Sequence, residues 1–234
     1  LAGGIAHDFN NILFPIMGHA EMLLGETDKE NKFARDSLKQ IYASALRAKE
    51  LIQQILTFSR QEETILNPIR IQVIAKEVIK LMRSTLPQSI EIRQRIDGNC
   101  APVRADATQI HQIIMNLATN AYHAMGEAGG ELQIGLNEIQ VSPQDSKSLG
   151  IRAGKAVCLS VADTGSGIPQ DLIKKIFDPF FTTKEEGEGT GMGLSVVHGI
   201  VKTHGGAIAV DCTAGQDTCF RVLLPAAGED GKQT

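Results

Sequence analysis

Hydrophobic side chains recur at helical spacing in the first quarter of the chain. Apolar or small residues alternate at intervals of three and four from residue 38 to 59, the heptad pattern of a helix that packs against other helices. A second amphipathic run covers residues 1–24, and the polar segment GETDKEN separates the two. Because two helices cannot cover both apolar seams, the pattern predicts a helical hairpin that forms a dimeric four-helix bundle. Packing of the hairpin against the rest of its own chain is the alternative.

The pattern changes around Pro68, where the heptad ends and short alternating runs begin. We expect a helix over 73–86, a second helix that opens at the cap-like sequence DATQ from Asp106, and several strands. The predicted strands cover 90–96, 131–141, 157–162, 207–212 and 218–224. This order predicts an α+β two-layer sandwich, with a mixed sheet and helices on one face. The predicted domains are residues 1–66 and 67–228, followed by a polar tail at 229–234.

Composition narrows the classes of partner. The 234 residues carry a formal net charge of −4, which gives no general electrostatic attraction to nucleic acid or anionic lipid. No apolar run approaches the roughly 20 residues that cross a bilayer, so we expect no membrane contact by this fragment. The four cysteines form no CxxC pair, which favours a cytoplasmic location. Because the chain begins at Leu1 inside a helical pattern, we expect it to be part of a longer protein, which leaves open a membrane anchor elsewhere.

Two asparagines stand on one face of the helix QIHQIIMNLATNAYHAM. Asn116 and Asn120 are four residues apart, with His123 one turn further on, while isoleucines and Leu117 mark the other face. An amide oxygen is a hard ligand that suits Mg²⁺, which keeps most of its waters when it accompanies a nucleotide. Taken alone, the pair is more typical of two ordinary surface amides.

Two glycine-rich segments follow. In CLSVADTGSGIP an apolar strand ends at Asp163, whose carboxylate can accept a hydrogen bond from the adenine amine, and Gly165 and Gly167 allow backbone close to the base. In EGTGMGL three glycines lead into a helix that begins near Leu194, where free backbone N–H groups can hold phosphates. This second segment lacks the Lys-Ser or Lys-Thr of a Walker loop, and its GxGxG spacing is not a dinucleotide fingerprint.

The order of these motifs resembles the catalytic domain of the sensor histidine kinases. The sequence has two helix asparagines, then DTGSG, then FDPFFTTK from Phe177 to Lys184, then GxGxG before a helix. That domain belongs to the GHKL-type ATPases, with gyrase, heat-shock chaperones and mismatch-repair MutL. The segment AHDFNNIL is similar to the phosphoacceptor motif of the same kinases, especially nitrogen-regulation and hybrid members, so the resemblance covers nearly the whole chain.

The resemblance implies roles for individual residues. Asn120 would be the Mg²⁺ ligand, with Asn116 beside it, and Asp163 would bind the adenine. Residues 182–189 would form a mobile lid, held against the domain by Phe177, Phe180 and Phe181, with the helical hairpin as an alternative surface for these rings. The rest of the implied nucleotide site consists of His123, Gly165, Gly167, Lys184, Gly189, Thr190, Gly191, Gly193, Leu194 and Thr218. The chain departs from the family at two positions, with His123 where many relatives carry Lys or Arg, and Asp217 in GQDTCF where the last motif often reads GxGTxF.

The first helix contains two histidines that helical periodicity separates. With Ile5 at 0° and about 100° per residue, the apolar stripe is centred near zero, His7 lies at about 200°, and His19 lies within or beside the stripe. We therefore expect His7 on the exposed side, with Asp8 adjacent and Asn11 one turn on. A neutral imidazole can attack a γ-phosphoryl group while a carboxylate accepts its other ring proton. For His19, His111, His198 and His204 we expect structural roles.

The leading hypothesis is the core of a homodimeric sensor histidine kinase. It would use ATP and Mg²⁺ to phosphorylate His7, and pass the phosphoryl group to an aspartate of a response-regulator receiver domain. The family position of Asn11 can orient water against phospho-aspartate, so phosphatase activity is a second expected function. One alternative is a scaffold or phosphatase in which ATP gates conformation without kinase chemistry. Another is an ATP-driven clamp, which needs a catalytic carboxylate just before Asn116, where this chain has apolar residues and Gln112.

Overall fold

The computed structural model of this chain describes residues 2–28, 30–59, 66–183, 190–213 and 215–227. Within these ranges, side chains are described except at 2–10, 43, 46, 47 and 49–59. The chain divides into two compact units, Leu1–Glu63 and Thr64–Thr234, and each is described by itself. In the described ranges no helix is both long and apolar enough to span a membrane.

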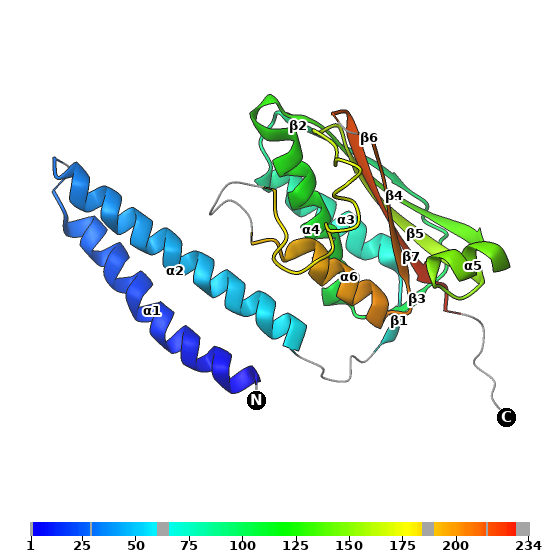
Figure 1. Cartoon of the computed structure of the whole chain (residues 1–234), viewed down its shortest axis with the longest axis horizontal. Helices are drawn as coiled ribbons and strands as arrows, with labels where there is room; N and C mark the ends of the chain where they lie inside the picture. Colours follow the sequence, from blue (N-terminus) through cyan, green and yellow to red (C-terminus); the bar gives the residue numbers. More distant parts are fainter. Residues whose placement is uncertain (1, 29, 60–65, 184–189, 214, 228–234) are drawn as a thin grey trace. The chain divides into compact units, whose positions relative to one another are not determined.

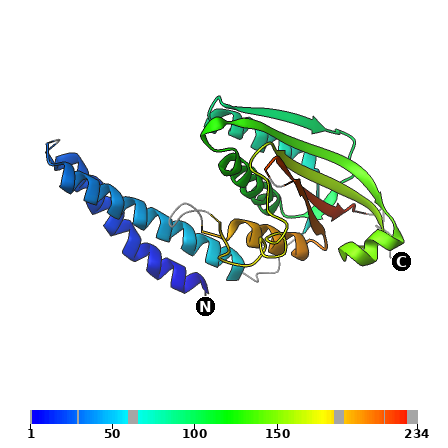
Figure 2. The ribbon, with the colours of Figure 1, turned by 45° about the horizontal axis from the view of Figure 1, so that its top comes forward.

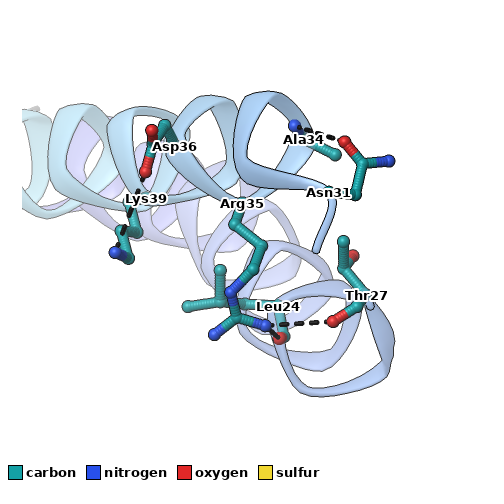
Figure 3. A network of polar contacts seen from close by, with 7 residues as sticks. All are labelled: Leu24, Thr27, Asn31, Ala34, Arg35, Asp36 and Lys39. Carbon is teal, nitrogen blue, oxygen red and sulfur yellow. Dashed lines mark hydrogen bonds and ion pairs between the residues drawn. The ribbon is translucent and has the colours of Figure 1, made fainter. Parts of the chain in front are cut away.

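The first unit is a hairpin of two helices, α1 (Ala2–Glu26) and α2 (Lys32–Ser59), which run side by side (Figures 1 and 2). The small residues Ala20 and Ala45 are buried in this unit. At the turn, one Arg35 nitrogen, Nη1, donates to the backbone carbonyls of Leu24 and Thr27, each at 3.0 Å (Figure 3). The guanidinium thus pairs carbonyls at the end of α1 that have no helical N–H partner. The predicted hairpin is confirmed.

Part of the predicted apolar stripe remains exposed in the single hairpin. Ile12, Ile16 and Leu23 of α1 are between 40% and 58% exposed, and Ile41 of α2 is 48% exposed. His19, which we expected on the packed side, is exposed with them. The packing prediction for His19 is therefore not met within one chain, because its neighbours in the stripe are not covered by α2.

The second unit is built on a mixed five-stranded sheet. Its strands lie in the order β2 (Ile90–Ile96), β4 (Gly130–Val141), β5 (Gly154–Asp163), β7 (Asp217–Pro225) and β6 (Ala207–Thr213). The pair β2–β4 is parallel, and the other pairs are antiparallel. All five strands were predicted, with ends that differ by at most a few residues.

Three helices cover one face of this sheet: α3 (Ile71–Thr85), α4 (Ala107–Met125) and α6 (Gly193–Thr203) (Figure 2). Alternate residues of the central strands, such as Leu132, Leu159 and Val222, are fully buried against them. Asp106 caps the start of α4 as predicted: its carboxylate accepts from the N–H groups of Thr108 at 2.7 Å and Gln109 at 3.1 Å. This layer positions the site.

The prediction of helices on only one face is wrong. The short helix α5 (Pro143–Leu149) belongs to a second apolar cluster on the other face, formed by Val141, Ile151, Ala156, Cys158, Ala207 and Leu223 with Ile139 and Leu149 packed against it. The sequence PQDSKSL lacks apolar periodicity, and α5 depends instead on its caps: the Ser142 hydroxyl accepts from the Asp145 N–H at 3.1 Å, and Gly150 is left-handed. Two strands of three residues each, β1 (Asn67–Ile69) and β3 (Val103–Ala105), and the 3₁₀ turn η1 (Gly126–Ala128) were also not predicted.

Candidate functional site

A buried carboxylate stands at the end of β5. Asp163 is 5% exposed and lies directly across from Leu132 of β4 and Thr218 of β7. Its Oδ1 accepts the Gly165 N–H at 2.9 Å, and its second oxygen has no hydrogen bond to any described residue. Burial raises the pKa of this carboxyl, the Gly165 N–H lowers it, and the Asp217 carboxylate raises it. A buried acceptor that lacks a protein donor is suited to a donor from a ligand.

The turn after Asp163 is held by backbone on two sides. The Ser166 N–H donates to the Ala124 carbonyl of α4 at 3.1 Å, and the Ser166 carbonyl accepts the Gly215 N–H at 2.8 Å. A Cβ on Gly165 would lie 2.7 Å from the Ala124 carbonyl carbon. Gly167 has φ +67°, and a Cβ there would overlap the Thr213 carbonyl oxygen. Both glycines are therefore required by close packing.

The two asparagines of α4 meet the start of α6. The Asn116 Nδ2 donates to the Gly193 carbonyl at 3.3 Å, and the position of a Cβ on Gly193 lies 3.8 Å from the Asn120 Nδ2. The Asn120 amide makes no hydrogen bond to a described residue and is only partly buried. The structure thus brings Asn116 and Asn120 next to Gly193, which lies more than seventy residues further along the sequence.

The first turn of α6 is open to a ligand. The residue that precedes it, Met192, is buried, and no side chain of the described residues caps the helix. The unpaired N–H groups and the helix dipole favour an anion at this end. The preceding Gly191 has φ +65°, and a Cβ there would overlap the backbone of Phe180. The segment that leads into α6 is therefore packed on the FDPFF segment.

The phenylalanines of that segment differ in their packing. The ring centroids of Phe177 and His198 lie 5.5 Å apart, with the two rings tilted relative to each other. Phe177 and Phe181 both pack against the core. Phe180 is 63% exposed with φ +68°, so the expectation that it packs against this domain is wrong. Its backbone turn places the side chain outward while the backbone contacts Gly191.

His204 connects the two helices of the site, a role that sequence reasoning did not identify. It is 6% exposed, and its Nε2 accepts the Asp106 N–H at 3.1 Å. Its Nδ1 lies 2.8 Å from the Ile200 carbonyl, so a neutral ring with its proton on Nδ1 satisfies both contacts. The expected structural role of this histidine is confirmed. Only the sequence THGG at the end of α6 could have suggested it.

The remaining predicted residues have different positions. Thr218 is buried, Leu194 packs against the core, and Thr190 accepts the Met192 N–H at 3.4 Å through its hydroxyl. His123 is exposed, and its ring lies 5.4 Å from that of Tyr122. Lys184 and Gly189, with most of the expected lid, lie outside the described residues.

The phosphoacceptor candidates belong to α1, and of the three only the Asn11 side chain is described. Asn11 is exposed, and the side chains of His7 and Asp8 lie outside those described. Phe14 and Met22, which helical periodicity places near the His7 side of the helix, are 59% and 58% exposed. This side of α1 therefore offers apolar surface beside Asn11.

The fold and this site define an ATP-binding domain of a known class. Residues 105–228 match the family described as histidine kinase-, DNA gyrase B-, and HSP90-like ATPase, and residues 1–64 match the His Kinase A phospho-acceptor domain. The chain belongs to the sensor histidine kinases.

Individual relatives support this assignment. The sensor kinase CckA of Brucella abortus is 39% identical over 98% of this chain, and the chain spans 24% of its length. The sensory histidine kinase/phosphatase NtrB of Azospirillum brasilense is 32% identical over 98% of this chain, which spans 56% of that relative. The chain is thus similar to a part of each of these proteins.

Solved structures have the same architecture. Full-length ShkA in complex with AMPPNP is 26% identical, with a TM-score of 0.74 over 97% of this chain and 45% of its own. The histidine kinase ThkA in complex with the response regulator TrrA is 25% identical, with a TM-score of 0.66 over 97% of this chain and 61% of its own.

Proposed function

We propose that this chain is a kinase core that binds Mg·ATP and phosphorylates its own His7. The observation that carries the proposal is the arrangement of a buried, half-paired carboxylate, Asp163, and the uncapped start of α6 beside Asn116 and Asn120. The first can accept the adenine amine, and the second can hold phosphates. AMPPNP in the related ShkA structure supports a nucleotide of this kind. We retain residues 1–66, 67–228 and 229–234 as the proposed domains and tail.

The residues present fit a magnesium ion. The Asn120 amide lies next to the start of α6 without a protein hydrogen bond among the described residues, so its oxygen is available as a hard ligand. When bound, Mg²⁺ would neutralise charge on the phosphates during transfer. The predicted phosphate contacts His123, Lys184 and Gly189 remain proposals.

The chain's own groups would perform the transfer in one displacement. A ring nitrogen of neutral His7 attacks the γ-phosphorus, a nitrogen–phosphorus bond forms, and the bond to the bridging oxygen breaks with ADP as the leaving group. Asp8 accepts the proton from the other ring nitrogen as positive charge develops. The first-turn N–H groups of α6 hold the nucleotide phosphates and stabilise the charge on ADP.

The phosphoryl group would then pass to an aspartate of a response-regulator receiver domain. The exposed Phe14 and Met22 offer apolar surface on the same side of α1 as Asn11, where a partner could dock. A response regulator in complex with the related ThkA supports this class of partner. In a separate phosphatase reaction, Asn11 would orient water against the phospho-aspartate, which releases inorganic phosphate. We propose a homodimer, because Ile12, Ile16 and Ile41 are uncovered in one hairpin, and a cytoplasmic location.

Incubation with γ-labelled ATP tests the proposal. We expect an acid-labile label that His7→Gln abolishes and that His19→Gln, a matched control on the same helix, retains. A label of unchanged intensity on the His7→Gln variant contradicts the assignment.

Mixed dimers test the oligomer. One chain carries His7→Gln and the other Asn120→Ala, so label in the mixture requires one subunit to phosphorylate the other, and its absence shows transfer within a chain. A molecular mass in solution equal to that of one chain contradicts the dimer.

A further inference from the structure

A thiol lies in the same row of the sheet as the buried carboxylate. The register pairs Cys212 of β6 with Thr218 of β7, and Thr218 with Asp163 of β5. Cross-strand partners point to the same face, and neighbouring strands are about 4.8 Å apart. Cys212 is therefore one strand from Thr218 and two strands from Asp163, on the helix-covered face.

Two buried polar groups in this row lack protein partners. Thr218 is 3% exposed, and neither its hydroxyl nor the second oxygen of Asp163 makes a hydrogen bond to a described residue. Both residues are at most 5% exposed, yet each keeps a polar group that a ligand entering the site can pair. Cys212 lies on the edge strand β6, next to Thr218, and is partly exposed. A reagent in solvent can therefore reach its thiol beside the site that a nucleotide would fill.

The Cys212 thiol also supports the turn that forms this site. Its Sγ donates to the Ile168 carbonyl at 3.4 Å, one residue after Gly167. Gly167 in turn packs on the carbonyl of Thr213, the neighbour of Cys212 in β6. A larger group on the sulfur would remove this donor from the Ile168 carbonyl.

We propose that Cys212 is a thiol-modification site whose occupancy and nucleotide binding oppose each other. The inference rests on the nucleotide site proposed above. The reaction is exchange with a small disulfide: the Cys212 thiolate attacks one sulfur, a mixed disulfide forms, and the other half leaves as a thiolate that takes up the proton. By linkage, if bound nucleotide disfavours the mixed disulfide at equilibrium, the mixed disulfide weakens nucleotide binding by the same factor.

The neighbouring strand supplies an internal control. Cys219 is partly exposed like Cys212, but it lies next to Thr218 in sequence and so points to the opposite face of the sheet. There it lines a cavity of about 450 Å³ with Arg221 and Ser160. Burial raises the pKa of the Cys219 thiol, Arg221 lowers it, and the carboxylates of Asp211, Asp217 and Asp163 raise it. Cys219 therefore reports thiol reactivity on the face of the sheet opposite to the nucleotide site.

The experiment equilibrates the full chain with mixtures of oxidised and reduced glutathione, with and without saturating Mg·ADP, and measures each cysteine by peptide mass spectrometry. We expect ADP to raise the ratio of oxidised to reduced glutathione at which half of Cys212 is modified by about tenfold or more, and the corresponding ratio for Cys219 by less than about twofold. In a Cys219→Ser background, glutathione treatment should weaken ADP binding by calorimetry, and dithiothreitol should restore it. In a Cys212→Ser variant the treated and untreated affinities should be equal.

Two results distinguish a failure of the Cys212 inference from a failure of the proposed nucleotide site. If untreated protein binds ADP but Cys212 reacts equally with and without it, or does not react at all, the inference is wrong while the proposed site stands. If untreated protein does not bind ADP, the proposed nucleotide site itself fails.

Discussion

Replacement of Asp163 by asparagine separates nucleotide binding from folding. Asparagine can keep an oxygen toward the Gly165 N–H, now paired at 2.9 Å, but it then presents an NH₂ group where the second carboxylate oxygen was. A hydrogen bond to a charged group contributes about 1.5–3 kcal/mol. Its loss, with a donor now facing the adenine amine, should weaken ATP binding at least about 10- to 160-fold.

The same substitution should leave the stability of the ligand-free protein equal or higher at neutral pH. The pKa of the Asp163 carboxyl is raised by burial and by Asp217, so folding favours the protonated form. The stabilising contribution of this group is thus present at low pH and is lost as pH rises through the folded pKa. Asparagine at position 163 carries no charge at neutral pH, so the variant does not lose this stability as the pH rises.

Calorimetry with ATP and urea unfolding of the same samples test both halves. Asp217→Asn is the matched control, because this exposed neighbour acts on Asp163 only through charge, and its ATP affinity at neutral pH should change by less than about threefold. Wild-type affinity should fall as pH falls through the raised Asp163 pKa, and in Asp217→Asn that fall should begin at a lower pH. Unchanged ATP affinity in Asp163→Asn, or a loss of more than about 2 kcal/mol in stability, would refute the reasoning.

Three further substitutions test how the site is held. His204→Ala leaves the Asp106 N–H without its buried partner, while the Ile200 carbonyl keeps the backbone N–H of residue 204. Urea unfolding should therefore show a loss of about 1–3 kcal/mol, whereas equal midpoints would show that water replaces the ring. Gly167→Ala should lower ATP affinity in calorimetry, because a Cβ overlaps the Thr213 carbonyl at φ +67°; an unaltered affinity would mean that the turn can shift without cost. Asp106→Ala removes the cap of α4 and should cost about 0.5–2 kcal/mol, with Asp106→Ser recovering most of it; equal stability of the two variants would contradict the capping role.

The sequence predicted the order of elements well because their periodicity is strong. The heptad over residues 38–59 and the alternation over 131–141 correspond to α2 and β4. The short elements were not predictable in this way. The helix α5 has seven residues with one large aliphatic side chain, Leu149, so it depends on its caps and on the far face of the sheet, which no local pattern encodes.

For the site, motifs identified side chains but not backbone partners. Asn116, Asn120 and Asp163 were recognised from their spacing and order, and the structure brings Asn116 and Asn120 to the start of α6. The Ala124 carbonyl, which holds the Ser166 N–H, carries no sequence signal because every residue has a carbonyl. The exposed Phe180 was misjudged because its positive φ reverses the direction that an apolar run would suggest.

The turn after Asp163 is fastened to α4 on one side and to the β6–β7 connection on the other, both times through main-chain atoms. Its shape is consequently insensitive to most side-chain changes in those two segments. Many amino acids can replace Gln216 and still leave the Gly215 N–H in place, provided that the backbone path is kept, whereas the Cβ of Ala124 lies against Gly165. A library that randomises those side chains while retaining Ala124, Gly165, Gly167 and Asp163 should therefore contain many members that bind nucleotide, which gives an engineer room to alter the rim of the site and keep its base-binding end.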